Sequence, residues 1–264
     1  MEVRILGFTY NDTVSADMGL KARLTSWQVC GGLRNYTASI PGKSGVADFG
    51  ADFDYREINV SCSIAPKRNF TSLVSLLDDI SLWLDPTDGL KQLVFDDVPD
   101  RYFMARLYEK VDCERLLVRS AGSFDLKFFC PDPFAYAVED EEFTISSTGS
   151  HTVRRTKGNI DSHPVYRIKG VITSGVSNYI TITTNSSQLK IVNATLTTSE
   201  TLVVDTDMMT AWVEDANGNV LRNGLPYLSE LNFPTLSVGG NTIAVAANNA
   251  TFSSLDIQAK SRWR

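Results

Sequence analysis

Histidine is scarce in this chain: His151 and His163 are the only two among 264 residues. A histidine-rich metal site is therefore excluded, because such sites need several imidazoles close to cysteines or carboxylates. The sequence also lacks a G-x-S-x-G nucleophile elbow and any other catalytic signature. A Ser–His–Asp triad stays open, because such triads form in space rather than in sequence. We expect no enzymatic activity, no bound metal and no cofactor.

Long apolar runs and an excess of positive charge are missing as well. No segment approaches the roughly 20 apolar residues that span a bilayer, and the start, MEVRILGFTYNDT, lacks the features of a secretory signal. Lys and Arg number 25 against 31 Asp and Glu, a formal charge of −6. Stable nucleic-acid binding needs a basic surface. We expect a protein that is made in a cytoplasm, has no membrane segment and does not bind nucleic acid stably.

The four cysteines, Cys30, Cys62, Cys113 and Cys130, all lie in the first half of the chain. None forms the C-x-x-C pair of a zinc site, and sequence cannot choose among the three disulfide pairings that four cysteines allow. Cys62 and Cys130 each continue an alternating apolar face, which suits a small buried side chain. Because no export signal is visible, we expect free, buried thiols.

The first half is predicted to be mainly β with a single helix. Apolar residues alternate over 56–64, which indicates a half-buried strand. Three- and four-residue spacing from Phe70 to Leu84 predicts an amphipathic helix that stops at Asp85-Pro86. Further strands are expected at 91–95, 101–108 and 122–130, the first two joined by a tight turn over the sequence DDVPD.

A domain boundary is expected after CPDPFAY, where prolines and then an acidic run from Glu139 to Glu142 interrupt the strands. The sequence therefore predicts two domains, 1–136 and 137–264. The second is rich in Ser, Thr and Asn, with short β-rich runs and no helix, which is typical of a β-sandwich or jelly roll. Asn217-Gly218 predicts a hairpin turn, since both residue types tolerate a positive φ.

Three short segments resemble functional motifs without completing them. Gly42-Lys43-Ser44 looks like the end of a phosphate-binding loop, but Thr37 occupies the position of the required first glycine and no helix follows. The run 215–219, DANGN, resembles part of a calcium loop with its glycine two places too early. Asp96, Asp97 and Asp100 are read as turn residues rather than as cation ligands.

Several stretches together resemble the distal tail protein family of long-tailed phages, the siphophages. In the first half these are the loop Pro41-Gly42-Lys43-Ser44-Gly45, the strand REINVSCSI followed by a helix ending WLDP, then FDDVPDRYFMA and FFCPDPF. In the second half they are Pro164 with its strand, Leu202 to Asp205, the segment FPTLSVGGNTIAV and the ending Trp263-Arg264. The family often carries Arg at the position of Lys43, and both residues keep a cation in the loop.

The resemblance implies a tail-tube-related, β-sandwich-like N-terminal domain that forms a homo-hexameric ring, and a galectin-like C-terminal β-sandwich. It places the protein at the virion tail tip or baseplate of a phage or prophage. It also implies contacts with the tail tube protein, a tail-associated protein and receptor-binding proteins. The Gly-rich loop from 41 to 54 would suit reaching onto a neighbouring subunit, with these candidate residues: Pro41, Gly42, Lys43, Gly45, Phe49 and Phe53.

A second hypothesis is a carbohydrate-binding module of the baseplate, in which the C-terminal sandwich itself binds the host cell wall. Trp212 and Tyr227 are its candidate sugar-stacking residues. Exposed aromatic rings on one face of the sandwich would favour this hypothesis, and burial of both rings would count against it. A third hypothesis, a wall hydrolase, needs two carboxylates within roughly 5 to 10 Å of each other in a cleft.

Overall fold

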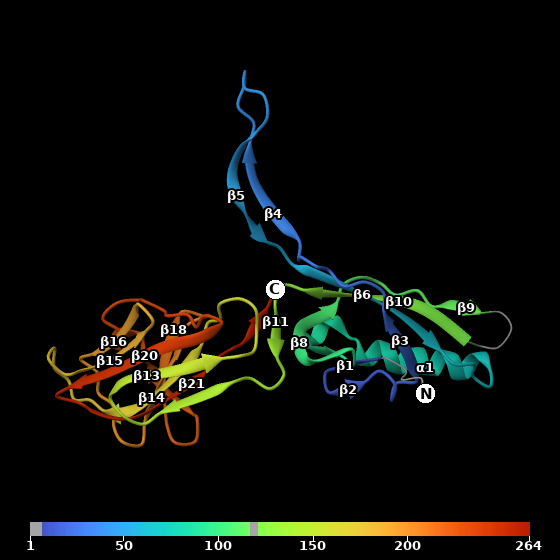
Figure 1. Cartoon of the computed structure of the whole chain (residues 1–264). Coiled ribbons are helices and arrows are strands. Elements are labelled where there is room, and N and C mark those ends of the chain that lie inside the picture. The colour runs from blue at the N-terminus through green and yellow to red at the C-terminus, as the bar shows by residue number, and fades with distance from the viewer. Residues whose placement is uncertain (1–6, 117–120) are drawn as a thin grey trace. The chain divides into compact units, whose positions relative to one another are not determined.

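The computed structural model describes residues 7–116 and 121–264, so residues 1–6 and 117–120 of the expected first domain lie outside the described residues. The chain divides into two compact units, the second of which spans Glu139–Trp263, so the division falls after Val138, two residues beyond position 136 (Figure 1). Both units are mainly β, and the prediction of a mainly β fold with one α-helix is confirmed for the described residues. No helix in the described part of the chain is long and apolar enough to cross a membrane.

The N-terminal unit consists of one large sheet with an α-helix packed against it. Its main sheet has the order β2-β1-β7-β8-β10-β6-β3, with β9 added to β10 and β11 to β8. The strands are β1 (Phe8–Tyr10), β2 (Thr13–Val14), β3 (Leu20–Leu24), β6 (Arg56–Ile64), β7 (Lys91–Phe95), β8 (Val98–Leu107), β9 (Glu114–Leu116), β10 (Ala121–Cys130) and β11 (Ala135–Ala137). As the alternation predicts, β6 buries Ile58, Val60, Cys62 and Ile64 on one side.

The one α-helix, α1 (Phe70–Trp83), begins and ends where the sequence predicts. Asn69 caps its start, since the Oδ1 atom accepts a hydrogen bond from the Ser72 backbone N–H at 2.8 Å. Asp85 then opens a short 3₁₀ turn over Pro86–Asp88. The helix buries Leu73 and Ile80, and Trp83 Nε1 donates to the Tyr10 carbonyl at 3.0 Å.

Two expectations for this half are wrong in detail. The connection between β7 and β8 consists of Asp96 and Asp97 alone, because Phe95 pairs with Val98 and strand β8 already contains Pro99 and Asp100. All four cysteines are free, but Cys30 is exposed and Cys113 is only partly buried. Cys62 and Cys130 are buried as predicted, and burial raises the pKa of each thiol to about 12.

The C-terminal unit is a β-sandwich, as predicted. One sheet has the order β12-β21-β14-β17-β18-β19 and the other β13-β20-β15-β16. The first contains β12 (Glu142–Ile145), β14 (Val165–Val171), β17 (Thr201–Asp205), β18 (Thr210–Glu214), β19 (Val220–Asn223) and β21 (Thr251–Gln258). The second contains β13 (Gly149–Arg155), β15 (Tyr179–Thr184), β16 (Ser187–Val192) and β20 (Gly239–Asn248); a 3₁₀ turn at Leu225–Tyr227 and β22 (Arg262–Trp263) complete the unit. Aliphatic side chains from both sheets fill the core, and the hydroxyl of buried Tyr166 on β14 meets that of Thr184 on β15 at 2.7 Å.

The hairpin predicted at Asn217-Gly218 is present, but its loop is longer than a two-residue turn. Five residues, 215–219, connect β18 to β19, and of the two predicted turn residues only Gly218 has a positive φ, of 82°. The Asp215 carboxylate accepts hydrogen bonds from the backbone N–H groups of Asn217 and Asn219 at 2.8 and 2.9 Å. That carboxylate therefore closes the turn. Among the described residues, no group of three or more His, Cys, Asp or Glu could hold a metal ion.

Glu200 gives the C-terminal unit a pH-dependent contribution to stability. Its carboxylate accepts from Arg222 and from the Thr197 backbone N–H at 2.9 Å, which lowers its pKa to about 2. A depressed folded-state pKa stabilises the fold above the unfolded value of about 4.3, and this stabilisation is lost as the pH falls towards 2.

We expect Glu200→Gln to cost about 2 kcal/mol of unfolding free energy at pH 6, and much less at pH 2.5. Urea denaturation at the two pH values measures the difference, with exposed Glu230→Gln as the control. An equal loss at both pH values would contradict this assignment.

Candidate functional site

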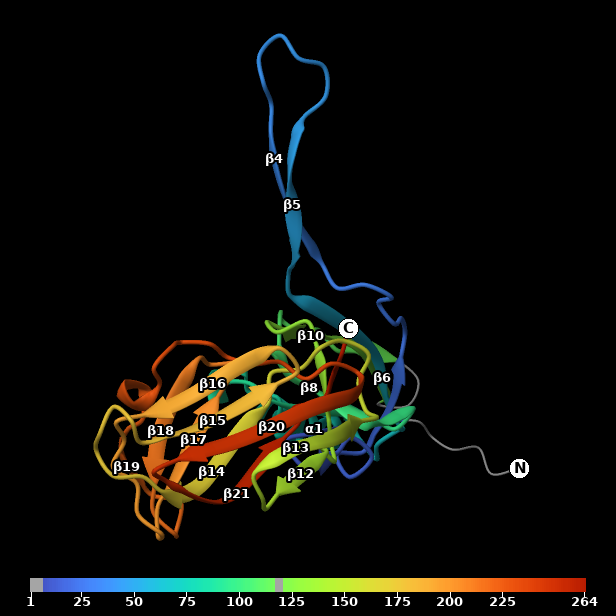
Figure 2. The same ribbon diagram turned by 60° about the vertical axis from the view of Figure 1, so that its left-hand side comes forward.

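A two-stranded ribbon, formed by β4 (Leu33–Ala38) and β5 (Ala47–Phe53), projects from the N-terminal unit (Figures 1 and 2). Within the described part of the chain, each of these strands pairs only with the other. The expectation of a loop from 41 to 54 is therefore wrong over Ala47–Phe53, where the chain forms strand β5. Pro41, Gly42, Lys43 and Gly45 do lie in the connection at the tip, so Gly42-Lys43-Ser44 precedes a strand and builds no phosphate-binding loop.

A bulge bends the ribbon in the middle. Asn35 pairs with Ala51 and Thr37 with Asp48, so the single residue Tyr36 faces two residues, Phe49 and Gly50. Gly50 has a φ of +101°, a conformation that L side chains rarely adopt, so glycine is required there. The Tyr36 hydroxyl donates to Asp52 at 2.9 Å and ties the two strands together beside the bulge.

Apolar side chains on this ribbon and in the connection at its tip are exposed to solvent. Phe49 is 71% exposed and Val46 is 56% exposed, and the exposed set also includes Leu33, Tyr36 and Ile40. A two-stranded ribbon without a packed face is marginally stable in water, and clustered apolar exposure marks an interaction surface. The ribbon therefore fits a segment that is completed by contact with another protein surface.

The base of the ribbon is anchored within the N-terminal unit. The ring of Phe53 lies 5.9 Å from that of Phe134, edge to face, and the Asp54 N–H donates to the Gly32 carbonyl at 2.7 Å. Phe53 thus has an intramolecular partner, whereas Phe49 projects into solvent. Of the two aromatic residues that the sequence suggests for a contact between subunits, Phe49 is the one with a free surface.

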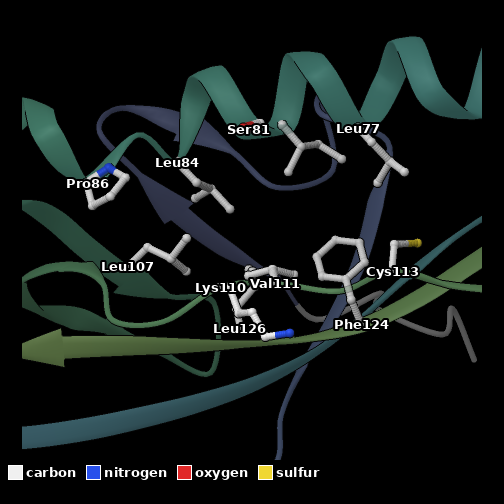
Figure 3. A pocket seen from close by; sticks show the side chains of 11 residues that line it. Leu77, Ser81, Leu84, Pro86, Leu107, Lys110, Val111, Cys113, Phe124 and Leu126 are labelled. Carbon is white, nitrogen blue, oxygen red and sulfur yellow. The ribbon is translucent and has the colours of Figure 1, made fainter.

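A hollow of about 370 Å³ lies between α1 and β10 (Figure 3). Leu77 and Leu84 point into it from the helix side, and Phe124 and Leu126 from β10. Its described lining is apolar except for Ser81, Lys110 and Cys113, and it contains no carboxylate. This lining continues the packing of helix on sheet and lacks the paired carboxylates that glycoside hydrolysis needs.

The two aromatic residues proposed for sugar stacking differ in their surroundings. Trp212 on β18 is half-buried, and its Nε1 donates to the Glu214 carboxylate at 3.3 Å. Tyr227 packs against the sandwich core, and its hydroxyl accepts from Arg222 Nε at 3.0 Å. Trp212 therefore keeps part of its ring available, while Tyr227 is already engaged at both its ring and its hydroxyl.

A second hollow, of about 280 Å³, lies over the six-stranded sheet of the C-terminal unit and is polar. No sequence motif marks this hollow, because its residues come from several strands and the loops between them. Its lining consists of Arg167, Lys169, Thr198, Ser199, Thr201, Glu214, Asp215, Ala216, Gly218 and Asp256.

Comparisons with known proteins agree with the architecture of both units. The model of the phage tail protein RIFT-related domain matches residues 22–130, and that of the siphovirus-type tail component C-terminal domain matches residues 157–263. The crystal structure of the Dit protein of phage SPP1, described as a paradigm of the hub adsorption apparatus in phages infecting Gram-positive bacteria, is 19% identical. That match has a TM-score of 0.72 and covers 99% of this chain and 100% of that one.

A weaker similarity links the chain to the baseplate of phage P2 in its activated conformation. The calcium-bound structure is 8% identical over 97% of this chain and 99% of that one, with a TM-score of 0.47. The strontium-bound structure gives the same identity and coverage with a TM-score of 0.48. No curated protein sequence matches the chain.

Proposed function

The chain belongs to the siphophage distal tail protein family, whose members are structural components of the phage tail, and on that premise we propose that six copies form a closed ring at the distal end of the tail. The ring joins the tail tube protein to the baseplate, and a tail-associated protein and receptor-binding proteins dock on it. The role is structural and non-enzymatic, in a virion assembled from chains made in the host cytoplasm.

The projecting ribbon is the observation that supports the ring. A closed ring repeats one heterologous contact, in which a patch on one subunit meets a different patch on the next. An arm such as β4–β5, with exposed Phe49, suits this kind of contact, because the arm and its receiving surface are different patches. Burying the arm also covers strands that are unstable alone in water.

Net charge is consistent with a ring that lets DNA pass through its channel. With a formal charge of −6, the chain repels a polyanion overall. In the proposed ring, the genome slides past the wall without binding to it.

Light scattering on the purified full chain, over a range of concentrations and with or without the tail tube protein, tests the ring. The expected mass at high concentration is close to six times the 29.2 kDa of one chain. A monomer at every concentration, even with the tail tube protein present, would overturn the proposal.

The alternative function is a carbohydrate-binding module that attaches the baseplate to the host cell wall. Engagement of Tyr227 by Arg222 counts against the pair of stacking residues first considered for it. Half-buried Trp212 favours it, because an accessible indole face can stack on a sugar ring.

A further inference from the structure

We propose that the outward face of the six-stranded sheet carries a binding site for a neutral saccharide, at the polar hollow beside Trp212. This proposal rests on the alternative function and assigns the sugar-binding site to particular residues. Every residue involved lies in the C-terminal unit, so the proposal does not depend on the ring. The strands that carry the site, β21, β14, β17 and β18, are adjacent in the sheet (Figure 2).

Strand register brings the polar side chains together. Asp256 on β21 pairs with Arg167 on β14, Lys169 on β14 with Thr201 on β17, and Thr201 with Glu214 on β18. Cross-strand partners lie on the same face of a sheet. Alternate residues of these strands, such as Ile168, Leu202 and Val213, are fully buried in the core, so the polar set faces outward.

Three hydrogen-bonded pairs hold this face in a fixed arrangement. The Glu214 side chain is only 11% exposed; it accepts from Arg167 Nη1 and, through its second oxygen, from Trp212 Nε1 at 3.3 Å. Asp256 Oδ1 accepts from the Thr144 hydroxyl at 2.7 Å. A surface ion pair is normally exposed on both sides and loosely held, whereas here a buried carboxylate orients an Arg167 side chain that stays 44% exposed.

The charged side chains that line the hollow favour a neutral ligand over an anionic one. Arg167 is matched by Glu214, Asp215 is occupied by the backbone of its own turn, and Lys169 and Asp256 remain as one cation and one anion. A phosphate or uronate polymer would meet three carboxylates. A sugar hydroxyl both donates and accepts, so it can bond to an ammonium or guanidinium on one side and to a carboxylate on the other.

Trp212 extends the site with an apolar surface. Arg167 pairs with Val203, and Val203 with Trp212, so the indole lies in the same cross-strand row as the guanidinium. The hydrogen bond to Glu214 fixes the indole edge. The hollow of about 280 Å³ is at the small end of ligand sites. It suits one or two sugar units whose apolar C–H face rests on Trp212.

Binding of the full chain to an array of neutral oligosaccharides, with glycerol-phosphate and uronic-acid oligomers as charged counterparts, tests the proposal. We expect retention on neutral probes. Calorimetry with the best probe should give a Kd at least about tenfold weaker for Lys169→Ala, Asp256→Ala and Trp212→Ala. Lys169 is exposed and Asp256 is half-buried at the surface, so at least these two variants are expected to keep the fold, which thermal unfolding checks.

The opposite sheet offers a matched control. Lys190 Nζ lies 4.6 Å from the centre of the Tyr179 ring, so Lys190→Ala and Tyr179→Ala remove a similar cation and aromatic ring away from the hollow. These variants should bind like the parent chain. The proposal would be overturned if the chain bound only charged probes, bound no saccharide, or bound a baseplate protein alone. Equal losses of affinity in the control and hollow variants would also overturn it. Loss of the ring alone would leave saccharide binding unchanged.

Discussion

The double substitution Val46→Ser and Phe49→Ser is expected to leave a folded monomer that no longer assembles into a six-chain ring. Both side chains are largely exposed in the single chain, so their loss removes little from the fold. In the proposed ring they are buried against the neighbouring subunit. Burying two such side chains contributes about 4 kcal/mol per contact, so each contact should weaken by roughly 10³-fold.

Light scattering measures the loss of the ring, and circular dichroism checks that the monomer stays folded. The matched control is Val176→Ser with Val220→Ser, which removes two exposed apolar side chains from the C-terminal unit, 83% and 66% exposed. An intact ring in the ribbon variant, or an equal loss in the control, would refute the role of the ribbon. Phe53→Ser is unsuitable for this test, because the contact of Phe53 with Phe134 anchors the base of the ribbon.

The substitution Phe128→Ala should cause a large loss of stability in the N-terminal unit. Phe128 is fully buried, with its ring centre 5.6 Å from that of Phe8 and 5.5 Å from that of Tyr10. Trp83 stacks on Phe8 at 5.6 Å, so one aromatic cluster joins β1, β10 and α1. Truncation of such a residue removes its contacts and leaves a cavity, at a cost of about 3–5 kcal/mol.

Guanidinium unfolding followed by tryptophan fluorescence measures this loss, since Trp83 belongs to the cluster. The neighbouring Phe129→Ala is the control: its half-buried ring lies on the opposite face of β10, 4.8 Å below the Arg106 guanidinium. We expect it to cost about 1 kcal/mol. Equal losses for the two variants would show that the cluster does not dominate the core.

Patterns tied to burial could be predicted from the sequence. The alternation in REINVSCSI and the helical spacing after Asn69 correspond to β6 and α1, because the same core forces both periodicities. The sandwich of the second half followed from its short β-rich runs and its lack of helices. The motifs FDDVPDRYFMA and FFCPDPF carried the resemblance to the distal tail proteins, which the family models confirm.

The ribbon and the polar hollow could be recognised only from the tertiary structure. Residues 48–52 are exposed, so their sequence shows no burial pattern, and Gly50 in their midst resembled a loop signal. Arg167, Glu214 and Asp256 are far apart in the chain and meet only through the register of β14, β17, β18 and β21. Sequence patterns report which side chains leave water, whereas pairing between distant strands decides which polar side chains share a surface.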